Sequence, residues 1–410
     1  MSLSKGKPRI LMIAYACDPK GSGEHQLGWG WLEAATRNYE VDLITTPKAR
    51  ASIEQEGGKI GISPHFVETP WWIRQLTETA GGSWWRKLAW QKRVAKLAAR
   101  LHSERSYSLV HQTTFHTFRV PFLATQLGLP SVWGPIAGGE SVPRDFERFL
   151  GPARLSERSR KLTNQVWLRF PSVQRSLRKS HALFVSNHTT LHFLPAWVHE
   201  KCQVVPPNAL RAEDEACPAR SREIRAGGPF KLLYAGNCVA TRAIPLVFEA
   251  LKESGLKGYE FEIAGTGPAL KWWKKRALEL GLMDGIKFLG KLPYEQLSRY
   301  YAEADVLAFP ALRDSGGSAV LEAMARYVPV VCLDWGGPGE MVDSQSGIKV
   351  QVTNAAATVK AFASALVRLR DNPGLGMELA RAARLRAETL FRWEAKRAVL
   401  ERTYQSLIRR

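Results

Sequence analysis

The 410-residue sequence contains few cysteines and no long apolar run. Its five cysteines are odd in number, scattered and without metal-ligand spacing, which indicates free thiols in a reducing compartment. No apolar stretch reaches the roughly 18 residues of a membrane-spanning helix. The first apolar run, residues 10–14, is too short for the core of a signal peptide. We therefore expect a cytoplasmic protein, peripheral on the inner face of the cell membrane rather than spanning it.

The sequence is also poor in acidic residues. It has 58 lysines and arginines against 38 aspartates and glutamates, which gives a formal net charge of +20. Such a charge predicts an anionic partner, either a phosphorylated ligand, a membrane surface or nucleic acid. No zinc finger or single-strand RNA module is apparent, so nucleic acid is not expected. No His/Cys cluster with zinc spacing and no Asp-x-Asp pair is present, so no bound metal is expected either.

Apolar runs alternate with helical patterns in both halves of the chain, which is typical of doubly wound α/β domains. The predicted strands are residues 10–14, 41–45, 109–111, 131–133, 182–185 and 203–205, then 231–234, 260–264, 286–289, 306–309 and 328–333. A polar stretch rich in proline and glycine, residues 206–229, separates the two sets. We therefore predict two facing Rossmann-like domains, residues 1–207 and 208–390, and a C-terminal helix over residues 391–410 that returns to the first domain.

The stretch from residue 309 to 340 has the pattern of an anion site. A buried strand ends at Pro310, and a loop with Asp314, Gly316 and Gly317 leads to a helix for which Ser318 is the expected N-cap. Backbone N–H groups of Gly316, Gly317 and Ser318 suit a diphosphate at the positive end of that helix. Asp314 and Glu322 could then accept hydrogen bonds from hydroxyls on either side. The alternative is that Glu322 only complements its own helix dipole.

A second glycine loop follows the first predicted strand. Gly21, Ser22 and Gly23 precede a helix expected from about residue 28 to 37, and their backbone suits close approach to phosphate. A glycine loop can equally serve only to turn the chain. A third glycine loop is expected at residues 336–339, after the strand over 328–333.

Residues 85–102 predict a basic amphipathic helix. Its apolar stripe consists of Trp90, Val94, Leu97 and Leu101. Its remaining surface is crowded with cations, namely Arg86, Lys87, Lys92, Arg93, Lys96 and Arg100. Basic helices with tryptophan often lie in a membrane interface, so the stripe either faces an anionic membrane or packs on the sheet.

Several motifs together resemble the retaining glycosyltransferases of family four, which have the two-Rossmann GT-B fold. Asp314 and Glu322, followed by A-M-A and P-V-V, are similar to the family's E-x7-E motif. Further segments resemble the family in the same order, namely A-C-D-P-K-G-S-G-E-H-Q-L-G-W (16–29), W-G-P-I-A-G-G-E (133–140), E-I-A-G-T-G-P (262–268) and L-D-W-G-G-P-G-E (333–340). The resemblance covers nearly the whole chain.

The resemblance implies a GT-B protein with an interdomain cleft that moves a sugar from a nucleotide diphosphate sugar to an acceptor hydroxyl, with retention. Glu322 would hold the ribose and Asp314 the transferred sugar. Main-chain groups would grip the diphosphate and sugar, in the loops Gly21–Ser22–Gly23 and Gly316–Gly317–Ser318. His116, preferred over His111, and His25 are candidates to contact the donor. The donor nucleotide sugar is a substrate, and no cofactor is implied.

The sequence departs from the family pattern at the end of the strand over 231–234. The family's strand-end arginine aligns with Asn237, after Gly236, and its lysine position holds Arg242. Two hypotheses remain. The first is a transferase in glycolipid, cell-surface or exopolysaccharide biosynthesis, with an acceptor sugar or lipid-linked saccharide at an anionic membrane surface. The second is a non-catalytic nucleotide-sugar or polyanion-binding protein that keeps the fold.

Overall fold

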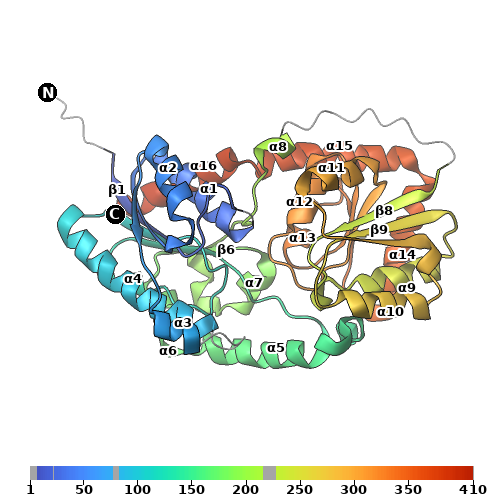
Figure 1. Ribbon diagram of the computed structural model, residues 1–410, viewed down its shortest axis with the longest axis horizontal. Helices are drawn as coiled ribbons and strands as arrows, with labels where there is room; N and C mark the ends of the chain where they lie inside the picture. The colour runs from blue at the N-terminus through green and yellow to red at the C-terminus, as the bar shows by residue number, and fades with distance from the viewer. Residues whose placement is uncertain (1–6, 22, 77–82, 216–227, 410) are drawn as a thin grey trace. The chain divides into compact units, whose positions relative to one another are not determined.

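The computed structural model describes residues 7–21, 23–76, 83–215 and 228–409, shown as ribbons in Figure 1. The chain forms two compact units. Unit 1 comprises Met1–Gly139, Leu162–Pro207 and Trp393–Arg410, and unit 2 comprises Glu140–Lys161 and Asn208–Arg392. One boundary thus lies at residue 207, where the sequence places the domain division. Residues 140–161, which the sequence assigns to the first domain, pack with unit 2 instead.

Unit 1 is built on a seven-stranded parallel sheet with the order β3-β2-β1-β4-β5-β6-β7. Its strands are β1 (Arg9–Ala14), β2 (Glu40–Thr45), β3 (Ser63–Phe66), β4 (Leu109–Gln112), β5 (Ser131–Ile136), β6 (Ala182–Val185) and β7 (Cys202–Val204). Its helices are α1 (Glu24–Thr36), α2 (Arg50–Ile60), α3 (Trp71–Leu76), α4 (Ser83–Arg105), α6 (Pro171–Lys179), α7 (His188–Phe193) and α16 (Trp393–Ile408), with 3₁₀ segments η1 (Pro47–Ala49), η2 (Leu123–Leu127) and η4 (Ala196–Lys201).

The C-terminal helix α16 is an integral part of unit 1. It packs on α1 and on β4, as Figure 1 shows for α1. Gly30 of α1 permits this contact, because a Cβ at that position would lie 1.9 Å from the Trp393 ring. Trp31 meets Trp393 edge to face at 5.8 Å. The Tyr404 hydroxyl also lies 2.6 Å from Nδ1 of His111 on β4.

Unit 2 is built on a six-stranded parallel sheet with the order β10-β9-β8-β11-β12-β13. Its strands are β8 (Phe230–Ala235), β9 (Tyr259–Ala264), β10 (Ile286–Gly290), β11 (Val306–Phe309), β12 (Val330–Leu333) and β13 (Ile348–Val350). Its helices are α8 (Ala212–Glu215), α9 (Ile244–Ser254), α10 (Leu270–Glu279), α11 (Tyr294–Glu303), α12 (Ser318–Ala325), α13 (Gly336–Met341), α14 (Ala355–Asp371) and α15 (Pro373–Leu390), with 3₁₀ segments η3 (Arg144–Ala153), η5 (Ala240–Arg242) and η6 (Met283–Gly285). Helix α5 (Arg154–Leu168) is divided between the units after Lys161.

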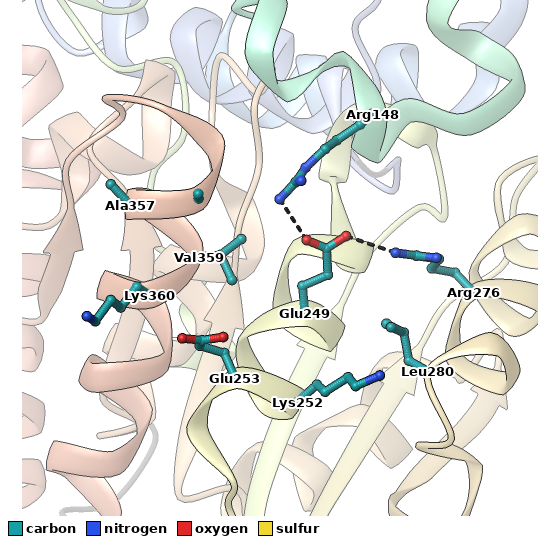
Figure 2. Close-up of a pocket in the computed structure, with 10 residues that line it drawn as sticks. Arg148, Glu249, Lys252, Glu253, Arg276, Leu280, Ala357, Val359 and Lys360 are labelled. Carbon is teal, nitrogen blue, oxygen red and sulfur yellow. Dashed lines mark hydrogen bonds and ion pairs between the residues drawn. The ribbon is translucent and has the colours of Figure 1, made fainter.

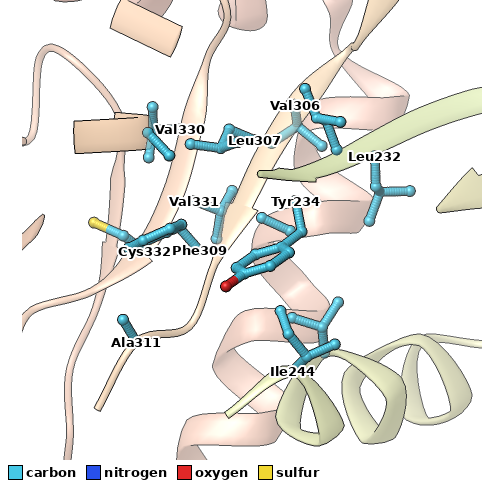
Figure 3. Close-up of a cluster of buried hydrophobic side chains, with 14 of the residues drawn as sticks. Leu232, Tyr234, Ile244, Val306, Leu307, Phe309, Ala311, Val330, Val331 and Cys332 are labelled. Carbon is cyan, nitrogen blue, oxygen red and sulfur yellow. The ribbon is translucent and has the colours of Figure 1, made fainter. Parts of the chain in front are cut away.

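The central strands of unit 2 are buried on both faces, which explains why they read as continuous apolar runs. Figure 3 shows side chains of β8, β11 and β12 packed with Ile244 of α9. Tyr234 of β8 stacks on Phe309 of β11, with ring centroids 5.9 Å apart. This core fixes the ends of β8 and β11, from which the candidate site loops emerge.

The prediction of two doubly wound α/β domains is confirmed, but several element boundaries are wrong. Helix α1 begins at Glu24 rather than near residue 28, because Gly23 supplies the N-cap with φ 57°. Gly317, with φ 61°, is the N-cap of α12, so Ser318 is the first helical residue and not the cap. The glycine loop expected at residues 336–339 instead begins the short helix α13.

Candidate functional site

The predicted site residues lie in loops at the switch points of the two sheets. In an open parallel sheet, ligands bind at the carboxyl ends of strands where the strand order reverses. In unit 1 this point lies between β1 and β4, and in unit 2 between β8 and β11. Gly21, Gly23 and His25 follow β1, and His116 follows β4. Gly236, Asn237 and Arg242 follow β8, whereas Asp314, Gly316, Gly317, Ser318 and Glu322 follow β11.

Asp314 already has partners for both of its carboxylate oxygens. Oδ1 accepts hydrogen bonds from the backbone N–H groups of Gly316 at 3.0 Å and Gly317 at 3.1 Å. Oδ2 pairs with the Arg242 guanidinium at 2.6 Å. The amides that the sequence predicts to hold a diphosphate therefore hold the Asp314 carboxylate in this structure. Two amides and a guanidinium converging on one carboxylate form an anion-binding arrangement.

Arg242 is held in place from several sides. It belongs to η5, its Nη1 donates to the Arg313 carbonyl at 3.2 Å, and its guanidinium lies over the Phe309 ring at 5.4 Å. Its Nε is buried and has no hydrogen-bond partner among the described residues. Gly236 and Asn237, in contrast, are exposed, and the Asn237 carbonyl accepts a hydrogen bond from the Tyr234 hydroxyl at 2.9 Å.

The glycine pair after β12 supports the Asp314 loop through close packing. The N–H of Gly337 donates to the Asp314 carbonyl at 2.7 Å. A Cβ at Gly337 would lie 2.6 Å from the backbone of Ser315, so no larger residue fits without a shift of the loop. The start of α13 is thus a backbone support beneath the anion-binding loop, which explains its glycines without a ligand of its own.

Glu322 lies on α12 with its side chain only 13% exposed. One oxygen accepts a hydrogen bond from the Tyr301 hydroxyl at 3.1 Å, and the other lies 3.9 Å from the Arg211 guanidinium. Burial raises the pKa of Glu322, and the positive charge of Arg211 opposes that shift. A buried carboxylate that makes one hydrogen bond and one long ion pair retains capacity to accept further hydrogen bonds.

Three contacts of this site were not predicted from the sequence. Nδ2 of Asn208 donates to the Gly316 carbonyl at 2.5 Å and to Oγ of Ser318 at 3.0 Å. Arg211 stacks on the Tyr294 ring at 4.7 Å while it faces Glu322. Both residues fall in the polar stretch 206–229 between the two predicted sets of strands, where no motif draws attention to them.

The third unpredicted contact comes from a part of the chain far away in sequence. Arg313, next to Asp314, makes a bidentate pair with Glu157 of α5, at 2.6 and 3.2 Å. Glu157 lies in the segment 140–161 that packs with unit 2. A pairing over 156 residues has no local sequence signal.

In unit 1, the loops after β1 and β4 are joined by a carboxylate. Oε1 of Glu24 accepts the backbone N–H groups of Phe115 at 2.7 Å and His116 at 3.1 Å. His25 Nδ1 and His116 Nε2 are buried, and within the described residues neither has a hydrogen-bond partner. Burial lowers the pKa of His116, which keeps its ring neutral at pH 7, although the Glu24 charge opposes the shift. Ser22, the middle residue of the predicted loop, lies outside the described residues.

For two other features of unit 1, His111 and the apolar stripe of α4, the structure shows side chains packed in the core. His111 is fully buried between Tyr404 and the Gly134 carbonyl, and burial lowers its pKa to about 4. On α4, Trp90, Val94 and Leu101 are buried in the core, so this stripe cannot face a membrane. Within the described residues, no helix combines the length and hydropathy that crossing a bilayer requires.

Unit 2 also has a cavity of about 740 Å³ away from these loops, lined by charged and apolar residues of η3, α9, α14 and the end of α10 (Figure 2). At its centre Glu249 pairs with Arg148 at 2.8 Å and Arg276 at 3.1 Å. None of the predicted site residues lines it.

Comparison with known proteins gives consistent similarities. A family described as Glycosyl transferases group 1 matches residues 219–385. A D-inositol 3-phosphate glycosyltransferase of Thermomonospora curvata is 33% identical over 385 residues, covering 88% of this chain and 85% of the relative. A glycogen synthase of Mycobacterium tuberculosis is 28% identical over 190 residues, covering 46% of this chain but only 45% of the relative.

Solved structures resemble the whole fold. The Anabaena protein HepE in complex with UDP superimposes with a TM-score of 0.64 at 16% identity, covering 97% of this chain and 100% of that protein. At that identity the likeness concerns the fold alone. The first curated relatives match over about half of their length or less, so the similarity to them is partial.

Proposed function

This chain belongs to the Glycosyl transferases group 1 family, whose members are retaining glycosyltransferases of the GT-B fold, and from that premise we propose that it transfers a sugar from a nucleoside diphosphate sugar to an acceptor hydroxyl. The observation that carries the proposal is the pair of acids after β11. Asp314 occupies an anion-binding arrangement of two amides and Arg242, and the buried Glu322 follows on α12.

We assign the ribose of the donor to Glu322. A carboxylate can accept two hydrogen bonds from neighbouring hydroxyls, and burial makes each of these stronger than it would be in water. Tyr301 fixes the orientation of the carboxylate by donating to one oxygen. Arg211, at 3.9 Å from the other oxygen, is close enough to compensate the charge without a short hydrogen bond.

We assign the diphosphate to the groups that hold Asp314 in this structure. When the donor binds, its phosphate oxygens would replace the Asp314 carboxylate on Arg242 and on the Gly316 and Gly317 amides. The Asp314 carboxylate would then accept hydroxyls of the transferred sugar. In unit 1 we propose that Gly21, Gly23, His25 and His116 contact the donor, because two of these side chains have buried ring nitrogens without partners.

The proposed reaction needs no side-chain base. The bond between the anomeric carbon and the phosphate oxygen breaks, the acceptor oxygen bonds the same face of that carbon, and the departing phosphate oxygen takes the acceptor proton. The protein contributes by stabilising the negative charge that develops on the leaving diphosphate. Arg242 and the two amides of the Asp314 loop are the groups suited to this role.

We further propose an acceptor in glycolipid, cell-surface or exopolysaccharide biosynthesis. The formal net charge of +20 favours an anionic acceptor or an anionic surface that carries it. The similar protein from Thermomonospora curvata is named for a phosphorylated acceptor, D-inositol 3-phosphate, which is consistent with this class.

The proposal is tested with a thermal-shift panel of UDP-, GDP- and ADP-sugars. A donor that binds only the folded protein raises the melting temperature in a concentration-dependent manner. We expect one nucleotide to stabilise the protein clearly more than the other two. If all three leave the melting temperature unchanged at millimolar concentration, the donor assignment is wrong.

A second candidate function is a nucleotide-sugar binder without transferase activity. The exposed, neutral Asn237 stands where the family pattern has an arginine, which leaves one cation fewer for the leaving group. The two functions share donor binding and differ in whether labelled sugar leaves the donor.

A further inference from the structure

We infer that unit 1 docks onto an anionic phospholipid bilayer through an exposed aromatic and basic surface, and that a groove in this surface receives one acyl chain. We call this surface the lipid face. It consists of exposed apolar side chains from α3, α4 and the α5–α6 region and of a groove beside α4. Its exposed apolar members are Trp71, Trp72, Trp85, Leu162 and Val166 outside the groove, and Phe170 at the groove's edge.

The side chains of the lipid face are unusually large for solvent-exposed positions. Trp71, Trp72 and Trp85 are 65%, 51% and 59% exposed, and Leu162 and Val166 are 72% and 62% exposed. Isolated exposed apolar residues need no explanation, but a contiguous group marks an interaction site. Tryptophan in particular is enriched where a protein meets the polar region of a bilayer.

Aromatic contacts join part of the lipid face into one cluster, from Trp85 through Trp84 to Trp167 and Phe170. The Trp84 ring lies 4.6 Å from Trp85, 4.3 Å from Trp167 and 5.9 Å from Phe170. Trp84 is itself fixed, because its indole N–H donates to the Arg119 carbonyl at 2.9 Å. Helix α3, which carries the other two tryptophans, packs on α4, and Figure 1 shows it beside the start of that helix.

Phe170 connects this cluster to a groove of about 730 Å³. The groove runs between α4, η2 and the start of α6. Its lining is apolar apart from Lys92, Lys96, Gln126 and Ser172, and comprises Leu88, Ala95, Ala99, Leu123, Ala124, Leu127 and Phe170. Small alanines on α4 keep it open. An acyl chain fits such a lining, while the two lysines can meet the phosphate of the same lipid.

Charge favours a bilayer over a second copy of this chain as the occupant. Helix α4 carries seven lysines and arginines and one acid, Glu104. Lys92, Arg93 and Lys96 are exposed and have no acidic partner among the described residues. Two such surfaces would repel each other, whereas each basic residue near an anionic membrane surface contributes to binding.

The lipid face differs from the stripe that the sequence pattern indicated on α4. That stripe is buried, and the apolar side chains that remain exposed come from α3, the start of α4 and a second set at helical spacing, Leu162, Val166 and Phe170. The lipid face deepens the proposed function and rests on it, because docking on a bilayer serves a transferase whose acceptor is linked to a lipid. Its test, however, uses no donor and no acceptor.

The test measures co-sedimentation of the full chain with vesicles of phosphatidylcholine alone or mixed with phosphatidylglycerol. We expect binding to the anionic vesicles, weakened by salt. The double variant K92Q/K96Q should bind about thirtyfold more weakly. The matched control K257Q/K271Q removes the same charge from unit 2 and should change binding less than about threefold. Equal loss in the two variants, or no preference for anionic vesicles, overturns the lipid face.

A further variant tests the groove itself. Ala99→Phe adds apolar surface but fills the groove, so it should weaken vesicle binding if an acyl chain enters and leave or improve it if docking is superficial. Unchanged or tighter binding overturns the acyl-chain part of the inference. Circular dichroism melting verifies that each variant is folded. If Trp85→Ser instead dissociates a dimer in sedimentation velocity and no vesicle binding is found, a second copy covers this surface and the inference is wrong.

Discussion

The substitution Glu322→Gln separates ligand binding from folding more cleanly than any other change in the site. Burial raises the pKa of Glu322, which means that the folded protein disfavours the ionised form. A neutral amide of the same shape avoids that cost, and it still accepts the Tyr301 hydroxyl. The melting temperature of ligand-free E322Q should therefore equal or exceed that of the wild type.

Donor binding by E322Q should nevertheless collapse. Two hydrogen bonds from ribose hydroxyls to a charged acceptor contribute about 1.5 kcal/mol each, so about 3 kcal/mol is lost, or roughly 150-fold in affinity. At a donor concentration near 100 times the wild-type Kd, the wild type gains about 2.7 kcal/mol, or about 5–10 °C in the unfolding of unit 2, which has about 200 residues. At the same concentration E322Q should shift by only about 1 °C.

The assay is thermal denaturation with and without the best donor nucleotide, supported by titration calorimetry. Glu295→Gln is the matched control, because it makes the same chemical change at an exposed position of the neighbouring helix α11. It should keep the full ligand-induced shift. An unchanged shift in E322Q would refute the ribose assignment, and a lower melting temperature of ligand-free E322Q would refute the argument from burial.

Other parts of the account give further predictions. Arg242→Gln should lower kcat by about 100-fold or more, because the leaving group loses its stabilising cation. A coupled assay of nucleoside diphosphate release measures kcat, and a near-normal value would contradict the role of Arg242. Donor affinity should fall as the pH is lowered through the raised pKa of Glu322, since the protonated acid cannot accept both hydroxyls; calorimetry across pH checks this, and E322Q should show no such dependence. Trp393→Ala should lower the free energy of unfolding of unit 1 by about 3 kcal/mol, measured in urea. Gly30→Ala should destabilise the Trp393→Ala variant less than the wild type, because the added Cβ no longer meets the Trp393 ring.

The sequence carries most of the information for the strands and little for the contacts between distant segments. Continuous apolar runs identified β8 and β11 because strands of a parallel sheet are buried on both faces. The short edge strands β3 and β13 were missed, since Ser63–Phe66 is only half-buried and Ile348–Val350 has three residues. Helix starts at Gly23 and Gly317 were misplaced because glycine caps in the left-handed region leave no side-chain capping signal.

The site shows the same division. Asp314 and Glu322 could be proposed from the sequence because motif order and local spacing single them out, and their roles at the donor stay a proposal. Two neighbours of the Asp314 loop were not predicted, since they reach it only through tertiary packing. Asn208 donates to the Gly316 carbonyl, and Glu157 pairs with Arg313. The sequence could not decide between a membrane and the sheet as the partner of the α4 stripe, because a hydrophobic period predicts that a stripe is buried but does not say against what. The structure shows that Trp90, Val94 and Leu101 pack in the core of unit 1.

One measurement tests the central claim most directly. The protein is incubated with a sugar-labelled form of the donor that stabilises it best, together with a panel of free and lipid-linked saccharides, and both hydrolysis and transfer are quantified. Our account predicts transfer of the label to an acceptor with the anomeric configuration of the donor retained, and loss of that transfer in R242Q. Tight donor binding without release of the label under any condition would contradict it, and would identify the protein as a binder rather than an enzyme.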